Sequence, residues 1–503
     1  MENINKNSLV TFNNGSYGII LLDNNNVYKL SFLYDNDVIL KNNIIECCML
    51  KNKLYNGYSK NIITAIVEIY SIKNLIEKFK FDNKFYNILK HYNCKNEDYV
   101  FFSKMKKYDI SLYDYFKKYK FNNFNFIAKE LLLGLYVLHQ NNFLHGDLKL
   151  ANIMYNNTDL NVVLIDFGGI KTIDSIFYNK TCTLTYRCPE ELNYEVNIKD
   201  KFYKPSFQND IWSLGIIFSE ILFSKSFIQN LYNTMINTIK FDKDIDNDAI
   251  IEEKFLNWFI NKKKVFNIGQ YAEEYKIIDV DNKIINIINK MLSIDNINRY
   301  NTVNEVYYDL FNENIKDNIN NDFKINYTYE LNISSDDFIK LKKIRKNYYE
   351  WLLDFYTNDE ILVILPLTFN IADRFYSCTL TKNIDIINKS INFDINKIIM
   401  ICCNLLSMVF LYKELPCITD IYNFFYIKNI KINYFNVIIQ TYICNILLCL
   451  DYDIYRPYIN NELTITIFDD TELFLKYKNK LYKNIHQNII SDKINITPED
   501  YIL

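Results

Sequence analysis

The residues best suited to chemistry lie in two short motifs, His145-Gly146-Asp147-Leu148-Lys149-Leu150-Ala151-Asn152 and Asp166-Phe167-Gly168. Together they supply a carboxylate, an ammonium group and amide and carboxylate oxygens that suit a hard cation such as Mg²⁺. Phosphoryl transfer needs this set of groups, together with a backbone loop that can approach phosphate oxygens. The two motifs therefore predict transfer of a phosphoryl group.

The N-terminal region contains the remaining groups that this chemistry needs. Gly15 and Gly18 would let a hairpin backbone approach phosphates, and Lys29 follows on a strand. Glu46 lies on the next predicted helix, where it can form an ion pair with Lys29. Taken singly, the glycine pair also fits a plain turn, the lysine a solvated side chain and the glutamate an exposed helical residue.

The elements that position these residues divide the chain into a strand-rich part and a helical part. Residues 9–30 favour strands, residues 38–54 have helical spacing, and helical periodicity dominates from residue 110, broken by short strand-like pieces within 143–168. Residues 312–334 are rich in Asn and Asp with weak periodicity, which indicates a linker. An almost wholly helical segment follows, and the tail at 459–503 has no clear pattern.

The motifs resemble those of the protein kinase family, in the order that the family uses them, over residues 9–311. The resemblance implies an α+β, bilobal protein kinase fold in residues 1–311, with a β-rich N-lobe to about 105 and an α-rich C-lobe from about 106. It implies that Asp147 orients the substrate hydroxyl, that Lys149 steadies the γ-phosphate and that Asn152 and Asp166 bind Mg²⁺.

The same resemblance implies a set of residues that contact ATP. They are Phe12, Gly15, Ser16, Tyr17, Gly18, Ile20, Lys29, Glu46 and Met105. Asn13 stands where the family has its first loop glycine. This replacement would make the phosphate-binding loop stiffer. His145 is expected to be a structural residue of the core.

Further motifs resemble those of cyclin-dependent kinases within this family. TYRCPE at 185–190 is similar to their WYRAPE, which implies a preference for proline after the phosphorylated Ser or Thr, and Arg299 would pair with Glu190. The family usually has an arginine that binds a loop phosphate where this chain has Gly146, and its activating threonine corresponds to Tyr178. We therefore expect activity without phosphorylation of this loop.

Residues 335–458 resemble one cyclin box, an all-α helical bundle, through Arg345, Asp373 and an apolar helix flanked by Lys397 and Glu414. A generic helical bundle would show similar apolar stripes. The resemblance implies an intramolecular kinase–cyclin contact through Ile44, Lys397 and Glu414, which would press the helix of Glu46 toward Lys29. Docking within a dimer is the alternative to docking within one chain.

Composition limits the partners and the location of the chain. Hydrophobic residues make up 49% and the net charge is −3, so we expect a folded protein with no broad cationic surface for nucleic acid. The apolar run from Ile398 to Tyr412 is too short to cross a membrane, and the N-terminus lacks a secretion signal. Eleven cysteines without a metal-binding spacing indicate reduced thiols, hence a cytoplasmic or nuclear protein.

These patterns predict a serine/threonine kinase that transfers the γ-phosphate of Mg-ATP to proteins and is activated by its own cyclin box. One alternative is a weak or inactive kinase acting as a regulatory binding module, whose cyclin box engages another kinase. Another is an autonomous kinase whose helical C-terminal region only binds substrates.

Overall fold

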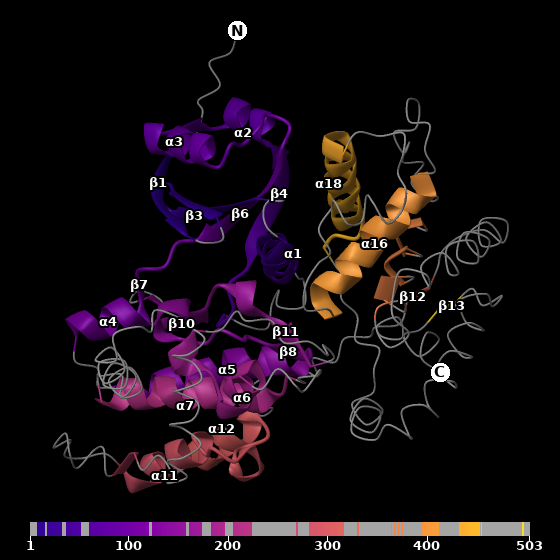
Figure 1. The fold of residues 1–503 in the computed structure, drawn as a ribbon. Coiled ribbons are helices and arrows are strands. Elements are labelled where there is room, and N and C mark those ends of the chain that lie inside the picture. Colours follow the sequence, from indigo (N-terminus) through magenta and orange to yellow (C-terminus); the bar gives the residue numbers. More distant parts are fainter. Residues whose placement is uncertain are drawn as a thin grey trace, which may run out of the picture. The chain divides into compact units, whose positions relative to one another are not determined.

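A computed structural model gives the fold (Figure 1). It describes residues 8–15, 18–32, 37–51, 60–119, 123–156, 160–173, 183–196, 205–223, 268–269, 281–315, 329–330, ten positions within 364–378 (364, 367, 368, 370–372, 374–376 and 378), and residues 395–411, 432–452, 454 and 495–496. The chain forms two compact units, one of Met1–Asn52, Thr64–Lys106 and Ile325–Leu503, and another of Lys53–Ile63 and Lys107–Lys324.

The first unit is built on a six-stranded sheet in the order β4-β6-β3-β2-β1-β5. Its strands are β1 (Ser8–Gly15), β2 (Gly18–Leu22), β3 (Asn26–Phe32), β4 (Ala65–Ser71), β5 (Lys80–Phe81) and β6 (Tyr99–Lys106). Neighbouring strands are antiparallel except for β1 and β5, which are parallel. The prediction of strands over 9–30 is therefore confirmed.

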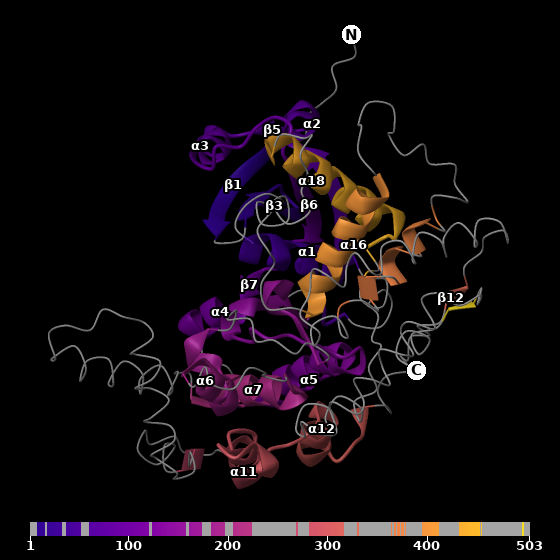
Figure 2. The same ribbon diagram turned by 45° about the vertical axis from the view of Figure 1, so that its right-hand side comes forward.

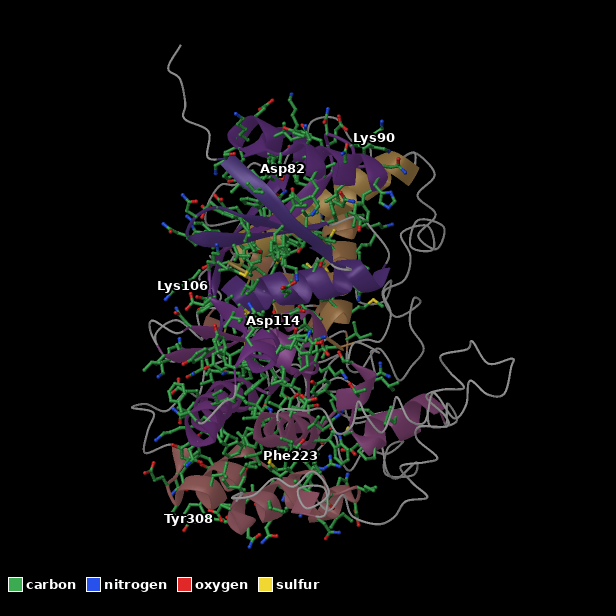
Figure 3. The ribbon with its side chains drawn as sticks, turned by 90° about the vertical axis from the view of Figure 1, so that its left-hand side faces the viewer. Asp82, Lys90, Lys106, Asp114, Phe223 and Tyr308 are labelled. Atoms are coloured by element: carbon green, nitrogen blue, oxygen red, sulfur yellow. The ribbon has the colours of Figure 1, made fainter. Side chains whose placement is uncertain are left out.

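Three helices accompany this sheet, namely α1 (Asp37–Lys51), α2 (Ile72–Lys78) and α3 (Asn83–His91). One face of the sheet buries an apolar cluster that includes Leu30, Phe85 and Phe102. Asp82, labelled in Figure 3, begins α3 and accepts hydrogen bonds from Phe85 N at 2.9 Å and Thr11 N at 2.8 Å. This carboxylate therefore caps α3 and joins it to β1.

The C-terminal helices belong to the same unit. Helices α16 (Ile395–Leu411) and α18 (Ile432–Cys449) pack against each other, and α16 also packs against α1, as Figures 1 and 2 both show. Both helices are rich in buried apolar side chains, such as Ile399, Leu406 and Leu447. The two-residue strands β12 (Tyr329–Glu330) and β13 (Asn495–Ile496) pair antiparallel.

The second unit is mainly helical, as expected for the part of the chain that follows residue 106. Its helices are α4 (Leu112–Lys118), α5 (Phe124–Gln140), α6 (Pro189–Val196), α7 (Phe207–Phe223), α11 (Asn282–Met291) and α12 (Val303–Phe311). Its strands are β7 (Ile110–Ser111), β8 (Phe143–Leu144), β9 (Ile153–Asn156), β10 (Asn161–Leu164) and β11 (Lys171–Thr172). Short 3₁₀ helices are η2 (Leu150–Asn152), η3 (Phe167–Gly169), η4 (Leu184–Tyr186) and η5 (Asn296–Asn298).

Two general expectations can be compared with the described part of the chain. The nine cysteines within it form no disulfide bonds with one another. No helix in the described ranges has the length and apolar character to span a bilayer. The boundaries set for the linker at 312–334, the bundle at 335–458 and the tail stay predictions.

Candidate active site

The loop after β8 holds the carboxylate of Asp147 with several donors. Asp147 Oδ2 accepts from Lys149 Nζ at 2.6 Å and from Asn152 Nδ2 at 3.1 Å. Its Oδ1 accepts from the backbone N–H of Thr183 at 2.9 Å and from Thr183 Oγ1 at 3.0 Å. A carboxylate fixed in this way can orient a hydroxyl group without first reorganising.

Asp210 of α7 anchors the backbone of the same loop. Its carboxylate accepts the backbone N–H groups of His145 at 2.8 Å and Gly146 at 3.1 Å, and lies 3.0 Å from His139 Nε2. Burial by itself raises the pKa of Asp210, but the hydrogen bond with His139 and the charges of His139 and His145 outweigh burial, and the pKa is lowered. The ionised carboxylate therefore belongs to the native loop.

His145 lies in the core, as expected. Its side chain is fully buried, its ring meets Phe167 edge-on at 5.8 Å between centroids, and its Nε2 lies 3.2 Å from the carbonyl oxygen of Ile165. Those contacts link the loop to the segment that carries Asp166.

Asn152 and Asp166 offer oxygen atoms that suit binding of a hard cation. Asn152 Nδ2 donates to the carbonyl oxygen of Asp147 at 2.9 Å, which leaves the amide oxygen as the atom able to accept a metal. Asp166 is in the left-handed region with φ of 63° and precedes η3. In the described ranges no cluster of three or more His, Cys, Asp or Glu could hold a metal. One carboxylate and one amide fit Mg²⁺, which usually takes few protein ligands besides water and phosphate.

Within the sheet unit, Lys29 and Glu46 form the ion pair that their spacing predicts. Lys29 Nζ lies 2.7 Å from Glu46 Oε1 and 2.6 Å from Oε2, and the two side chains are 11% and 5% exposed. Asn43 Nδ2 donates to the carbonyl oxygen of Phe32 at 2.8 Å, which ties α1 to the end of β3. The helix therefore holds Glu46 against its strand partner.

The hairpin β1–β2 contains the predicted glycine loop. Gly18 has φ of 151°, and a Cβ there would lie 2.3 Å from the carbonyl oxygen of Leu30, so only glycine fits. Gly15 pairs with Gly18 in the register of the hairpin. Ser16 and Tyr17 lie outside the described residues.

The other predicted ATP contacts lie on the same strands. Phe12 is at the register shift of β1 and is 65% exposed, whereas Ile20 on β2 pairs with Lys29. Met105 is buried on β6 opposite Val27. Their roles in binding nucleotide stay predictions.

The segment around 183–191 is fastened at several points. Arg299 Nη1 lies 2.5 Å from Glu190 Oε1 and its Nη2 lies 3.2 Å from Oε2, as the sequence predicts for this pair. Tyr186 Oη donates to Glu220 Oε2 at 2.7 Å. Burial, followed by the charge of Glu220, raises the pKa of Tyr186 well above its ordinary value, so this hydroxyl stays protonated.

Several contacts in these regions were not predicted. Ser103 on β6 pairs with Lys29 in the sheet and lies 3.9 Å from the Cys47 sulfur, while Lys171 on β11 and Glu191 on α6 form a buried ion pair. A lysine shortly after Asp166-Phe167-Gly168 and a second glutamate after Glu190 are the signals that could have drawn attention to that pair.

Fewer of the residues expected in the kinase–cyclin contact can be located. Ile44 is buried on α1 and Lys397 is half-buried on α16. Glu414, Arg345 and Asp373 lie outside the described residues. The structure brings α1 and α16 together as elements, and the individual contacts stay predictions.

Comparison with known proteins identifies a family for more than half of the chain. Residues 48–311, just over half of it, match the family model described as protein kinase domain. Cyclin-dependent kinase C-3 of Oryza sativa subsp. japonica is 38% identical over 102 residues, 20% of this chain and 29% of that protein. The CTD kinase subunit alpha of Saccharomyces cerevisiae is 27% identical over 198 residues, 38% of this chain and 36% of that protein.

Such similarities are confined to parts of the relatives. A cyclin-dependent kinase 12 of Drosophila melanogaster is 38% identical over 108 residues, which make up 20% of this chain and only 9% of that protein. The chain thus spans between 9% and 36% of the length of these three relatives. The cyclin-like character of residues 335–458 stays a prediction.

Proposed function

The chain belongs to the protein kinase family, and on that premise we propose that it transfers the γ-phosphate of ATP to Ser or Thr hydroxyls of proteins. The observation that carries this proposal is the carboxylate of Asp147, held at both oxygens by Lys149, Asn152 and Thr183. Cyclin-dependent kinases among its relatives support hydroxyl substrates of this class.

Each of these side chains has a role in the proposed reaction. Asp147 orients the incoming hydroxyl and accepts its proton as the bond to phosphorus forms. Lys149, which also donates to Thr183 Oγ1 at 3.0 Å, provides the positive charge for the transferred group. Lys29, paired with Glu46, holds the other phosphates of the nucleotide.

Asn152 and Asp166 would hold the Mg²⁺ that ATP brings to the site. A bound Mg²⁺ would offset the charge of the phosphate oxygens. Asn152 also fixes Asp147 through its amide nitrogen, so the same side chain serves the carboxylate and the cation.

Substitution of Asp147 by Asn tests this function. With Ser/Thr peptides that do or do not carry proline after the hydroxyl residue, we expect a fall in kcat of about 10³-fold for D147N. Asp114→Asn is the matched control, because Asp114 accepts a hydrogen bond from Ser111 at the exposed start of α4. Equal rates for D147N and wild type would refute the proposal, and a regulatory role that survives in D147N would favour the binding-module alternative.

We further propose that the C-terminal helices keep the kinase active by supporting α1. On one side α1 is tied to the sheet through Asn43 and Glu46, and on another side α16 packs against it. Tyr452, which follows α18 in the same unit, is buried, and burial raises the pKa of its hydroxyl well above its ordinary value. The bundle thus restrains the helix on which the Lys29–Glu46 pair depends.

A double substitution in the bundle tests this support. Lys397→Ala with Glu414→Ala should lower kcat/KM by about tenfold, since a misplaced Glu46 releases Lys29. The control is Asn445→Ala with Leu448→Ala, because both positions are exposed on α18. A chain ending at residue 311 that retains full activity would favour the autonomous kinase instead.

A further inference from the structure

A buried ion pair joins the two ends of the segment that runs from Lys171 to Glu191. Lys171 Nζ lies 2.7 Å from Glu191 Oε1, and the two side chains are 5% and 3% exposed. We propose that this pair is a permanent positioning device that holds residues 183–191 against Asp147, so that no phosphate is needed on the segment. The inference rests on the proposed kinase function and names how its active site is regulated.

Lys171 is placed at the N-terminal end of the segment by the strand pair β8–β11. It is in register with Leu144, directly before the loop that carries Asp147. Gly146 of that loop has φ of 72°, and a Cβ there would lie 2.1 Å from the carbonyl oxygen of Gly169 and 3.5 Å from Lys171 Cγ. A side chain, such as the arginine expected from the family, does not fit at Gly146. The positively charged side chain beside this position is therefore that of Lys171.

Glu191 is placed at the C-terminal end of the segment, in the first turn of α6. The preceding residue, Glu190, is bound by Arg299, and Cys188 is fully buried. A carboxylate fixed in the chain provides the negative charge that a phosphate would otherwise bring to Lys171. Because this charge does not depend on a modifying enzyme, the Lys171–Glu191 ion pair is formed permanently.

The pair acts on catalysis through Thr183. This residue donates twice to Asp147 Oδ1 and accepts from Lys149 Nζ. Between Thr183 and Glu191 the chain is also fixed by Tyr186, whose carbonyl oxygen accepts from Ser213 Oγ at 2.8 Å. Loss of the Lys171–Glu191 pair would remove a buried charge–charge contact between β11 and α6 and would displace α6, and with it Thr183.

The test compares Glu191→Gln with the exchanged pair K171E/E191K in the full-length chain. We expect E191Q to lower kcat by about tenfold with little change in KM for ATP, and K171E/E191K to recover most of the loss. Phosphatase-treated wild type, and a variant lacking the hydroxyls of Ser175, Tyr178 and Thr181, should keep wild-type kcat.

A second readout does not depend on activity. Arg187 is 6% exposed in the segment and Arg374 is 9% exposed in the other unit. In E191Q, an arginine-specific protease should cut after Arg187 about tenfold faster, with cleavage after Arg374 unchanged, since only the segment is released. Cleavage at both sites would indicate global unfolding and overturn the inference.

The outcomes separate the two proposals. Unchanged kcat and unchanged cleavage in E191Q, or a loss of activity on phosphatase treatment, would overturn the role of the pair. If wild type transfers no phosphate while cleavage after Arg187 still follows the pair, the proposed kinase function fails and the positioning role stands.

Discussion

At the scale of single residues, Gly146 is where backbone geometry restricts the choice of side chain most severely. Its φ of 72° lies in the left-handed region, which costs other residues about 1–2 kcal/mol, and a Cβ would also meet the Gly169 carbonyl oxygen at 2.1 Å. We expect Gly146→Arg to lower the free energy of unfolding by more than about 2 kcal/mol, measured by urea denaturation. Ile297→Arg, at a position 84% exposed, should change it by less than about 0.5 kcal/mol. A G146R variant as stable as wild type would contradict this.

Asp210 predicts a pH dependence of stability. Its pKa in the folded chain lies below the ordinary 3.8, so its ionised form favours folding. This stabilisation is complete at a pH above the pKa of Asp210 in the unfolded chain. It is lost as the pH falls through the lower pKa of Asp210 in the folded chain. Unfolding free energies measured from about pH 6 to 3 should fall less steeply in Asp210→Asn than in wild type, with Asp114→Asn behaving as wild type. Parallel pH profiles for D210N and wild type would argue against it.

The residues to which we assign chemical roles stand in local sequence motifs, whereas the residues that support them do not. Asp147, Asn152 and Asp166 stand at fixed spacings within short motifs, so the sequence alone marks them. Glu191 meets Lys171 only because β11 and α6 are brought together by the fold, and Ser103 meets Cys47 only across the sheet. Contacts of this kind leave no local pattern in the sequence.

At the scale of elements, the junction of β1 and α3 depends on one carboxylate. Asp82 caps α3 and accepts two further hydrogen bonds from Thr11, one of them at 2.6 Å from its Oγ1. These bonds outweigh burial, which alone would raise the pKa of Asp82, and the pKa is lowered. Asp82→Ala should therefore cost about 2–3 kcal/mol of unfolding free energy in urea denaturation. Ser111→Ala, which removes the cap of α4 and the exposed hydrogen bond to the Asp114 side chain, should cost about 1 kcal/mol, and an equal cost for both would be unexpected.

Long elements follow local periodicity, whereas the shortest ones depend on tertiary partners. Strands within 9–30 and the helix over 38–54 were predicted because alternation and helical spacing extend over several residues. The two-residue strands β5, β7 and β11 carry no such pattern. They form because β1, β9 and β8 lie beside them and complete their backbone hydrogen bonds.

At the scale of the whole molecule, the sequence predicted that C-terminal helices approach the helix of Glu46. Helix α16 does pack against α1, and both belong to one compact unit although they are far apart along the chain. The side chains that meet there could not be derived, because apolar stripes in a helical bundle permit many arrangements. A buried aromatic side chain of the C-terminal part, Tyr452, provides a means to test this support.

Tyr452 tests whether the C-terminal helices support the kinase. Its side chain is 3% exposed, and its hydroxyl is buried with no hydrogen-bond partner among the described residues. Tyr452→Phe removes this desolvated hydroxyl and should leave stability unchanged or raise it by about 1 kcal/mol. Tyr452→Ala removes the ring and should cost about 3–5 kcal/mol.

The kinase activity should depend on the aromatic ring of Tyr452 and not on its hydroxyl group. At a temperature where circular dichroism shows both variants folded, we expect Y452A to lower kcat/KM for ATP by about tenfold. The C-terminal helical part loses a buried ring, so that α16 supports α1 and the Lys29–Glu46 pair less firmly. Y452F and the exposed control Leu448→Ala should keep wild-type kinetics. A folded Y452A with the wild-type rate would mean that ATP use does not depend on this buried ring, and the C-terminal helices would then need another role, such as binding substrates.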